Sequence, residues 1–218
     1  MKTDLQLKQD VIEELRWEPS VNAAGIGVQV SGGVVTLVGQ VDSYGAKWDA
    51  EKAAQRVAGV AGLAVELMVN LPGFSERTDA DIARSVENTL EWTTYLPKDL
   101  VKVLVEKGWV TLSGQVEWEY QRRTAENAIR YLLGVTGVSN QIGIKPTVSL
   151  AVVRSDIEDA LKRSAASEAK KIAVEVQGSS VTLSGSVHSW SERDTARQSA
   201  WRTPGVTHVT DNIAVSYY

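Results

Sequence analysis

The chain contains one seven-residue pattern three times, and this repeat limits its fold more than any other feature. The pattern Val-Thr-Leu-x-Gly-x-Val covers residues 35–41, 110–116 and 181–187. Its glycines are 75 and 71 residues apart, and Gly-Val pairs at 59–60, 134–135 and 205–206 keep the same two offsets. Two motifs with a shared spacing indicate three tandem copies of one small unit rather than a single large domain.

Each copy is expected to begin with an amphipathic helix. Three apolar residues spaced four apart lie on one stripe of a helix, and the copies supply Leu7, Val11 and Leu15, then Ile82, Val86 and Leu90, then Ile157, Leu161 and Ala165. The expected N-caps are Thr3, Thr78 and Ser155, followed three residues on by Gln6, Asp81 and Glu158. The three copies are therefore predicted to start with equivalent helices.

Three strands and a second helix complete each copy. Alternating apolar residues predict a first strand around 26–30, 101–105 and 172–176. Glycines at 32–33, 108 and 178 predict a hairpin turn, after which the seven-residue pattern returns as the second strand. Its glycine indicates a bulge or a close backbone approach. A helix with small residues on its inner face follows, and a last strand is predicted at 63–69, 138–144 and 209–215.

This order of elements predicts an α+β fold of three tandem αββαβ units. In each unit two helices are expected on one face of a small three-stranded mixed sheet. We place the units at residues 1–71, 76–146 and 151–218. Short proline-containing linkers at 71–75 and around Pro146 separate them, so successive copies are expected to touch.

The repeated strand, the Gly-Val pair and a last strand of the form Val-x-x-x-Ile together resemble the BON domain, named for bacterial osmotic-stress and nodulation proteins. The resemblance covers roughly residues 3–70, 78–146 and 153–217, although the last strand of copy 1 departs from the form and reads Leu63-Ala64-Val65-Glu66-Leu67. It implies a non-enzymatic, stress-related module that binds phospholipid or other envelope components. It implies no particular binding residues.

No group of residues in the sequence points to catalysis, a metal ion or a cofactor. Cysteine is absent, and the two histidines, His188 and His208, lie in copy 3 without the spacing of a zinc site. Apolar residues and glycines repeat between the copies, whereas we identify no acidic or basic group that does. We therefore predict a protein that is not an enzyme and name no catalytic residue, no metal ligand and no cofactor.

The seven tryptophans are unusual beside a single phenylalanine. Six of them lie near the ends of predicted helices: Trp17, Trp48, Trp92, Trp118, Trp190 and Trp201. They either pack at core edges and contacts between copies or form a rim at a membrane interface or ligand groove. On the second reading, Trp118, Tyr120, Arg122 and Arg123 are the predicted lipid-binding residues, because aromatic and basic groups meet there at the start of one helix.

Charge and hydropathy indicate which classes of binding partner the sequence favours. The net charge is −4, which disfavours nucleic acid, and copy 1 alone carries −3, which disfavours anionic lipid. No window is long and apolar enough for a transmembrane segment, and the absence of an apolar leader predicts a cytoplasmic protein, or a periplasmic one if a signal was removed. Anionic phospholipid is one expected partner. The alternative is a protein partner of a cytosolic interaction or chaperone-like scaffold, and a small-molecule or ion sensor is a third reading.

Overall fold

The computed structural model describes residues 2–96, 100–145 and 172–216, and it confirms the α+β fold with three repeated units. Copy 1 consists of α1 (Asp4–Trp17), β1 (Ile26–Ser31), β2 (Val34–Val41), α2 (Tyr44–Arg56) and β3 (Gly62–Val69). Copy 2 consists of α3 (Asp79–Glu91), β4 (Val101–Glu106), β5 (Trp109–Val116), α4 (Glu119–Ile129) and β6 (Gly137–Ile144). Copy 3 shows β7 (Ile172–Gln177), β8 (Ser180–Val187), α6 (Trp190–Trp201) and β9 (His208–Val215).

The helix predicted over Ile157, Leu161 and Ala165, with its cap Ser155, lies outside the described residues. Short 3-10 helices stand before β1 (Ala23–Gly25) and in the first linker (Gly73–Ser75). The chain divides into two compact units, Met1–Gly114 with Thr124–Ile142, and Gln115–Arg123 with Gly143–Tyr218. The first unit therefore holds copy 1 and most of copy 2.

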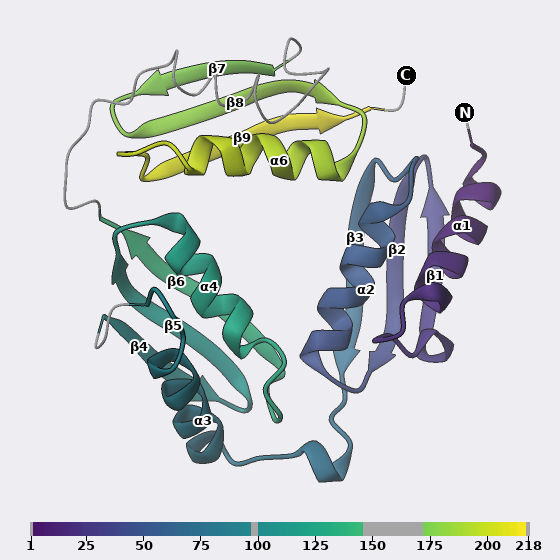
Figure 1. The fold of residues 1–218 in the computed structure, drawn as a ribbon. Helices are drawn as coiled ribbons and strands as arrows, with labels where there is room; N and C mark the ends of the chain where they lie inside the picture. The colour runs from purple at the N-terminus through teal and green to yellow at the C-terminus, as the bar shows by residue number, and fades with distance from the viewer. Residues whose placement is uncertain (1, 97–99, 146–171, 217–218) are drawn as a thin grey trace. The chain divides into compact units, whose positions relative to one another are not determined.

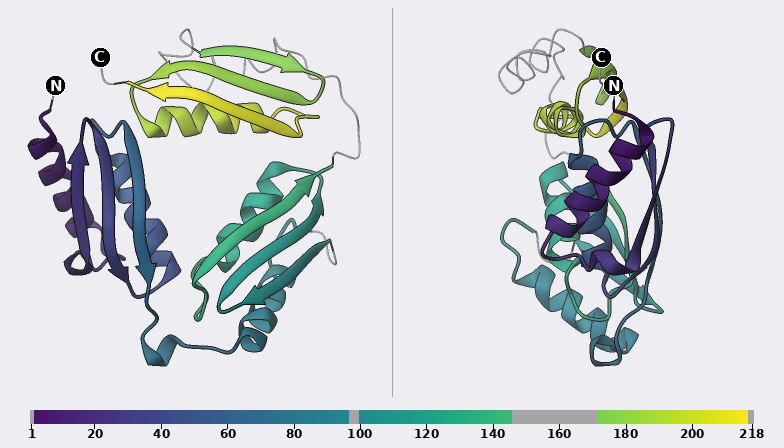
Figure 2. Two further views of the ribbon diagram at one scale, coloured as in Figure 1. Left: turned by 180° about the vertical axis from the view of Figure 1, so that it is seen from behind. Right: turned by 90° about the vertical axis from the view of Figure 1, so that its right-hand side faces the viewer.

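Each copy has its own three-stranded sheet, with the seven-residue pattern as the central strand. In the first and third sheets the first two strands pair antiparallel, and the last strand returns parallel to the middle one. A parallel return requires a crossover connection, which the second helix of each copy supplies. The described helices of each copy lie on one face of its sheet, as predicted (Figures 1 and 2).

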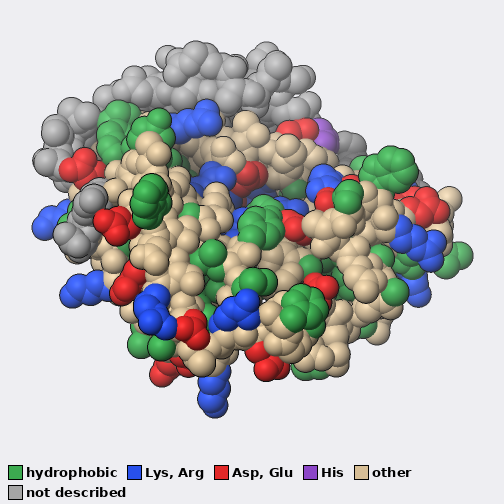
Figure 3. Space-filling model, turned by 60° about the horizontal axis from the view of Figure 1, so that its bottom comes forward, with side chains coloured by type: hydrophobic (Ala, Val, Ile, Leu, Met, Phe, Trp, Pro, Cys, Tyr) green, Lys and Arg blue, Asp and Glu red, His purple; other side chains and the backbone are tan. Residues whose placement is uncertain are grey.

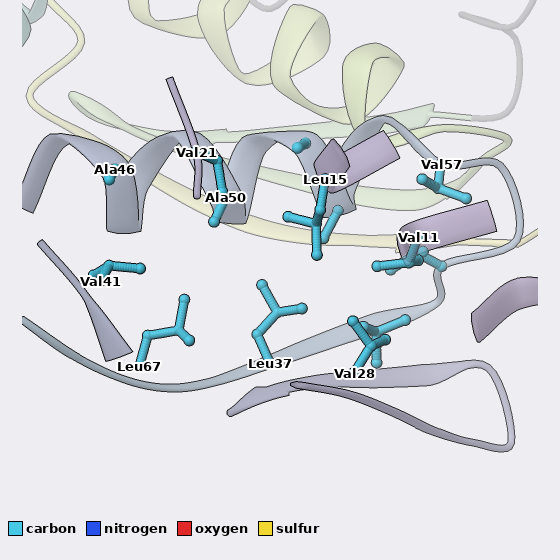
Figure 4. Packing of buried hydrophobic residues seen from close by; sticks show 14 of the residues in the cluster. Val11, Leu15, Val21, Val28, Leu37, Val41, Ala46, Ala50, Val57 and Leu67 are labelled. Atoms are coloured by element: carbon cyan, nitrogen blue, oxygen red, sulfur yellow. The ribbon is translucent and has the colours of Figure 1, made fainter. Parts of the chain in front are cut away.

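The core of copy 1 lies between that helical layer and the sheet. Leu37 of β2 is fully buried among Leu15 of α1, Ala50 of α2 and Leu67 of β3 (Figure 4). Leu112 and Leu183, the matching residues of the other copies, are also fully buried. Most of the small inner residues of the second helices are buried as predicted, because a helix without bulky side chains can approach the sheet closely: Ala50, Ala53, Ala54, Ala125, Ala196, Ser199 and Ala200. Ala128 is only half-buried.

The hairpin turns of copies 1 and 2 reveal an acidic group that both copies carry, which corrects our interpretation that no acidic group repeats. The backbone N–H groups of Gly32 and Gly33 donate to the Asp4 carboxylate at 2.8 and 3.1 Å. Asp79, at the equivalent position of copy 2, accepts from the N–H groups of residues 107 and 108 at 2.9 and 2.8 Å. The repeated aspartate is structural: it ties the start of the first helix to the turn between the first two strands.

Candidate binding surfaces

The predicted lipid-binding residues lie where β5 leads into α4. Gln121 fixes this junction, because its Oε1 accepts hydrogen bonds from the backbone N–H groups of Glu117 and Trp118 at 3.1 and 3.0 Å. The first helical turn therefore begins immediately after the strand. Trp118 and Tyr120 are 36% and 49% exposed, so both rings reach the surface of this part of the chain.

The two arginines of this group are half-buried, and Arg122 interacts with two other side chains. The guanidinium of Arg122 lies 5.1 Å from the centroid of the Trp201 ring, within cation–π range, and its Nη2 lies 3.7 Å from Glu119 Oε1. Burial raises the pKa of Glu119, while the positive charges of Arg123 and Arg122 act in the opposite direction. The structure thus brings the four predicted residues together, with the rings more exposed than the arginines.

A second aromatic feature is more exposed than this one. Trp17 and Trp92 are 84% and 88% exposed, and they occupy equivalent positions in copies 1 and 2, at the ends of α1 and α3. The reason is geometric. Each follows the last buried residue of its helix, Leu15 or Leu90, by two positions, which turns the side chain by roughly 200° away from the core.

The sequence contained the signal for this pair, because both tryptophans stand 75 residues apart at predicted helix ends. The sequence-based prediction instead chose the residues at the start of α4, because basic residues accompany the aromatic ones there. We call Trp118, Tyr120, Arg122 and Arg123 the α4 group. In copy 2 the exposed Tyr95 stands three residues beyond Trp92 and adds a second aromatic ring to the same end.

The surroundings of Trp17 are acidic but partly neutralised. Arg56 of α2 binds Glu14 and Glu18 with N–O distances of 2.9 and 2.7 Å. The hydrogen bond from Arg56 lowers the pKa of Glu18. Figure 3 shows acidic and basic side chains interspersed over one face of the molecule. The exposed ring of Trp17 therefore has acidic neighbours whose charge Arg56 partly neutralises.

Among the described residues no three histidine, aspartate or glutamate side chains are grouped so as to hold a metal ion. His188 has a structural contact, because its Nδ1 lies 2.9 Å from the backbone oxygen of Ser216. None of the described helices is both long and apolar enough to span a membrane.

Comparison with known proteins identifies a family. A model described as the BON domain matches residues 3–70, 78–146 and 149–217. No curated protein sequence matches the chain. BON domains are non-catalytic binding modules.

Among solved structures, two of CdsD are similar, a structural protein of the type III secretion system of Chlamydia trachomatis. One, of its C-terminal domain, has 13% identity and a TM-score of 0.26, covering 99% of this chain and 100% of that one. The other has the same identity and TM-score, with coverage of 96% and 92%. A likeness at this level carries no argument about this chain.

Proposed function

Because the chain belongs to the BON domain family, we propose that it is a non-enzymatic, stress-related module that associates with phospholipid or other components of a cell envelope. BON domains are associated with membrane and phospholipid binding and with stress roles. The observation that carries the proposal for this chain is the pair of exposed rings, Trp17 and Trp92, repeated at equivalent helix ends.

Exposed tryptophans at matching sites present large apolar rings that a contact could remove from water. An indole ring has a large apolar body and one N–H donor, so it gains free energy at the boundary between headgroups and acyl chains. Two rings on two copies of one chain would act together, since binding of one raises the local concentration of the other near the same surface. Trp17 and Trp92 therefore support association with a lipid interface through apolar contact.

The group at the start of α4 supports a different mode of the same function. Trp118 and Tyr120 would contribute rings, and Arg122 and Arg123 would contribute attraction to an anionic surface of about 1 kcal/mol each. That attraction weakens as salt rises, whereas apolar contact does not. The two surfaces can therefore be separated by lipid charge and ionic strength.

The test is co-sedimentation of the full chain with vesicles of phosphatidylcholine, alone or mixed with phosphatidylglycerol, at low and moderate salt. We expect wild type to bind both kinds of vesicle. A Trp17→Ala/Trp92→Ala variant should lose on the order of tenfold in partitioning per ring, as expected for the apolar area each ring would bury. A Trp118→Ala/Arg122→Glu/Arg123→Glu variant is the matched comparison for the α4 group, and both must keep the wild-type circular dichroism spectrum.

The outcomes discriminate between the surfaces. If only the α4 variant loses binding, and only with anionic vesicles at low salt, then the charged surface is the contact and the exposed tryptophan pair is not. If wild type binds neither vesicle at low salt, phospholipid association is rejected for this chain.

That last result would leave the second candidate, a protein-interaction or chaperone-like scaffold. One observation favours it: exposed apolar residues lie on strands of copies 1 and 2 next to residues that face the core. Leu104 of β4, Trp109 of β5 and Met68 of β3 are all exposed. A sheet face with apolar side chains can accept an apolar segment of another protein.

A further inference from the structure

Arg130 is buried although it stands directly after the end of a surface helix. It is 5% exposed, and its guanidinium lies 3.8 Å from the centroid of the Trp48 ring of α2. Its Nη2 lies 3.4 Å from Glu126 Oε1, and its Nε has no hydrogen-bond partner. Arginine is rarely buried this far without full pairing. The ring of Trp48 covers the Arg130 guanidinium. Trp48 belongs to copy 1 and Arg130 to copy 2, and both lie in the first compact unit.

The next residue, Tyr131, contacts the same helix. Its hydroxyl donates to Asp49 Oδ1 at 2.9 Å. Its ring covers Gly45, and a Cβ atom built on Gly45 would lie only 2.4 Å from Tyr131 Cδ1. A side chain larger than hydrogen at residue 45 could not be accommodated unless the tyrosine ring moved.

The backbone conformation at residue 45 does not require glycine. Gly45 stands in the first turn of α2, and its φ is not in the left-handed region. Glycine in a helix is less favourable than alanine because it loses more backbone freedom on folding. The equivalent residues of the other copies are Tyr120 and Ser191. Glycine at this one copy is explained by the ring that covers it.

The other contact residues also differ between copies, although the core residues repeat. The position of Trp48 carries Arg123 and Asp194 in copies 2 and 3, and that of Arg130 carries Gln55 and Trp201. A contact that is specific to two particular copies requires residues that the other copies lack. The residues of this contact meet that requirement, because each of them differs from its equivalents in the other copies.

We propose that Gly45, Trp48 and Asp49 on α2 form a docking surface for Arg130 and Tyr131 at the end of α4, and that this contact, the α2–α4 joint, holds copies 1 and 2 together as a pair. The recognition is by cation–π stacking, one hydrogen bond and a glycine that admits the tyrosine ring. The inference is independent of the proposed function. In the second unit Arg122 and Trp201 make a looser pair of the same kind, at 5.1 Å.

The absence of cysteine allows a direct test by disulfide formation in the full chain. The Gly45 Cβ position lies 3.5 Å from Tyr131 Cγ, so cysteines at these two positions can approach within bonding range. A Gly45→Cys/Tyr131→Cys variant should form an intramolecular disulfide at least about tenfold faster than a Gly45→Cys/Glu87→Cys control. Glu87 is an exposed residue of α3 in the same copy. Equal rates for the two pairs would overturn the proposal.

The contribution of the stack is tested in the same chain. Adding Trp48→Leu to the Gly45→Cys/Tyr131→Cys variant should slow disulfide formation several-fold, because the ring that covers Arg130 is lost. An unchanged rate would show that the stack does not hold the joint.

A second measurement keeps the test independent of cysteine. By hydrogen exchange and mass spectrometry, Gly45→Ala should speed amide exchange several-fold in the segment 128–133, because the new methyl group displaces Tyr131. In a Tyr131→Ala chain the same Gly45→Ala change should have no such effect. An identical response in both chains would contradict the joint, since Gly45 would then act within its own helix alone.

Discussion

At the residue scale, the repeat requires glycine at one position of its pattern. The three residues at this position are Gly39, Gly114 and Gly185. All three have φ between 128° and 132°, a region that side chains other than glycine rarely adopt. A Cβ on Gly39 would lie 2.1 Å from the Gly25 oxygen, and one on Gly114 would lie 1.9 Å from the Leu100 oxygen. The predicted alternative of a close backbone approach is confirmed for Gly39 and Gly114, which are the last residues of β2 and β5 to pair with the preceding strand. The parallel pairing with the last strand continues past Gly39 and Gly185 without an extra residue.

Gly114→Ala should destabilise copy 2 by at least about 2 kcal/mol, because both the φ angle and the Leu100 carbonyl oppose the methyl group. The measurement is urea denaturation followed by circular dichroism. Gly73→Ala is the matched control: its Cβ meets nothing within 4 Å, so the change should stay within about 0.5 kcal/mol. Equal losses for the two variants would show that the close approach is not a constraint in solution.

At the scale of elements, one aspartate side chain joins the first helix to the hairpin in copy 1 and another does so in copy 2. Asp4 and Asp79 stand at the first position of α1 and α3, after the caps Thr3 and Thr78. Each cap accepts a hydrogen bond from the backbone N–H three residues on, as predicted. The aspartate that follows each cap accepts hydrogen bonds from both backbone N–H groups of the hairpin turn. The residues of the turn have no partner in the strand pairing.

Asp79→Ala should therefore loosen the β4–β5 turn. The amides of Lys107 and Gly108 should exchange with solvent on the order of tenfold faster, as measured by NMR, because they lose their acceptor. The free energy of unfolding should fall by only about 1 kcal/mol, because the carboxylate is exposed. Glu87→Ala removes one negative charge from the same helix and serves as the control. If it accelerates those two amides equally, the effect is one of charge and not of the hydrogen bonds.

At the scale of the whole molecule, hydrophobic burial is organised copy by copy. The buried cluster around Leu37 consists only of residues of copy 1, and the cluster around Leu183 consists only of residues of copy 3. A repeat protein of this kind has an intrinsic stability for each copy, to which contacts between copies add. Unfolding of the full chain should then not be a single two-state event.

Leu37→Ala tests this organisation by differential scanning calorimetry. The fully buried leucine should cost copy 1 about 2–5 kcal/mol, out of the roughly 4–10 kcal/mol expected for about 70 residues. The transition of copy 1 should move to lower temperature, while that of copy 3 keeps its Tm. A uniform shift of all the heat absorption would contradict separate cores.

The candidate surfaces show where sequence reasoning reaches its limit. Proximity along the chain was enough to predict that Trp118, Tyr120, Arg122 and Arg123 come together. It could not give the relative exposure of the rings and the arginines, because Arg122 meets Trp201, which lies 79 residues later. The exposure of Trp17 and Trp92 could have been derived, since it follows from their angular distance from Leu15 and Leu90 around the helix axis.

The sequence by itself determined the repeat, the order of elements, the inward face of each element and the glycines at turns and close approaches. These features depend on period, turn chemistry and backbone sterics, which act over a few residues and recur in each copy. Only the tertiary structure decided that Asp4 and Asp79 hold the hairpins, that Arg122 stacks on Trp201 and that Arg130 is covered by Trp48. Each of these contacts joins residues 28 or more positions apart, and residue order specifies such pairs only through the folded backbone that brings them together.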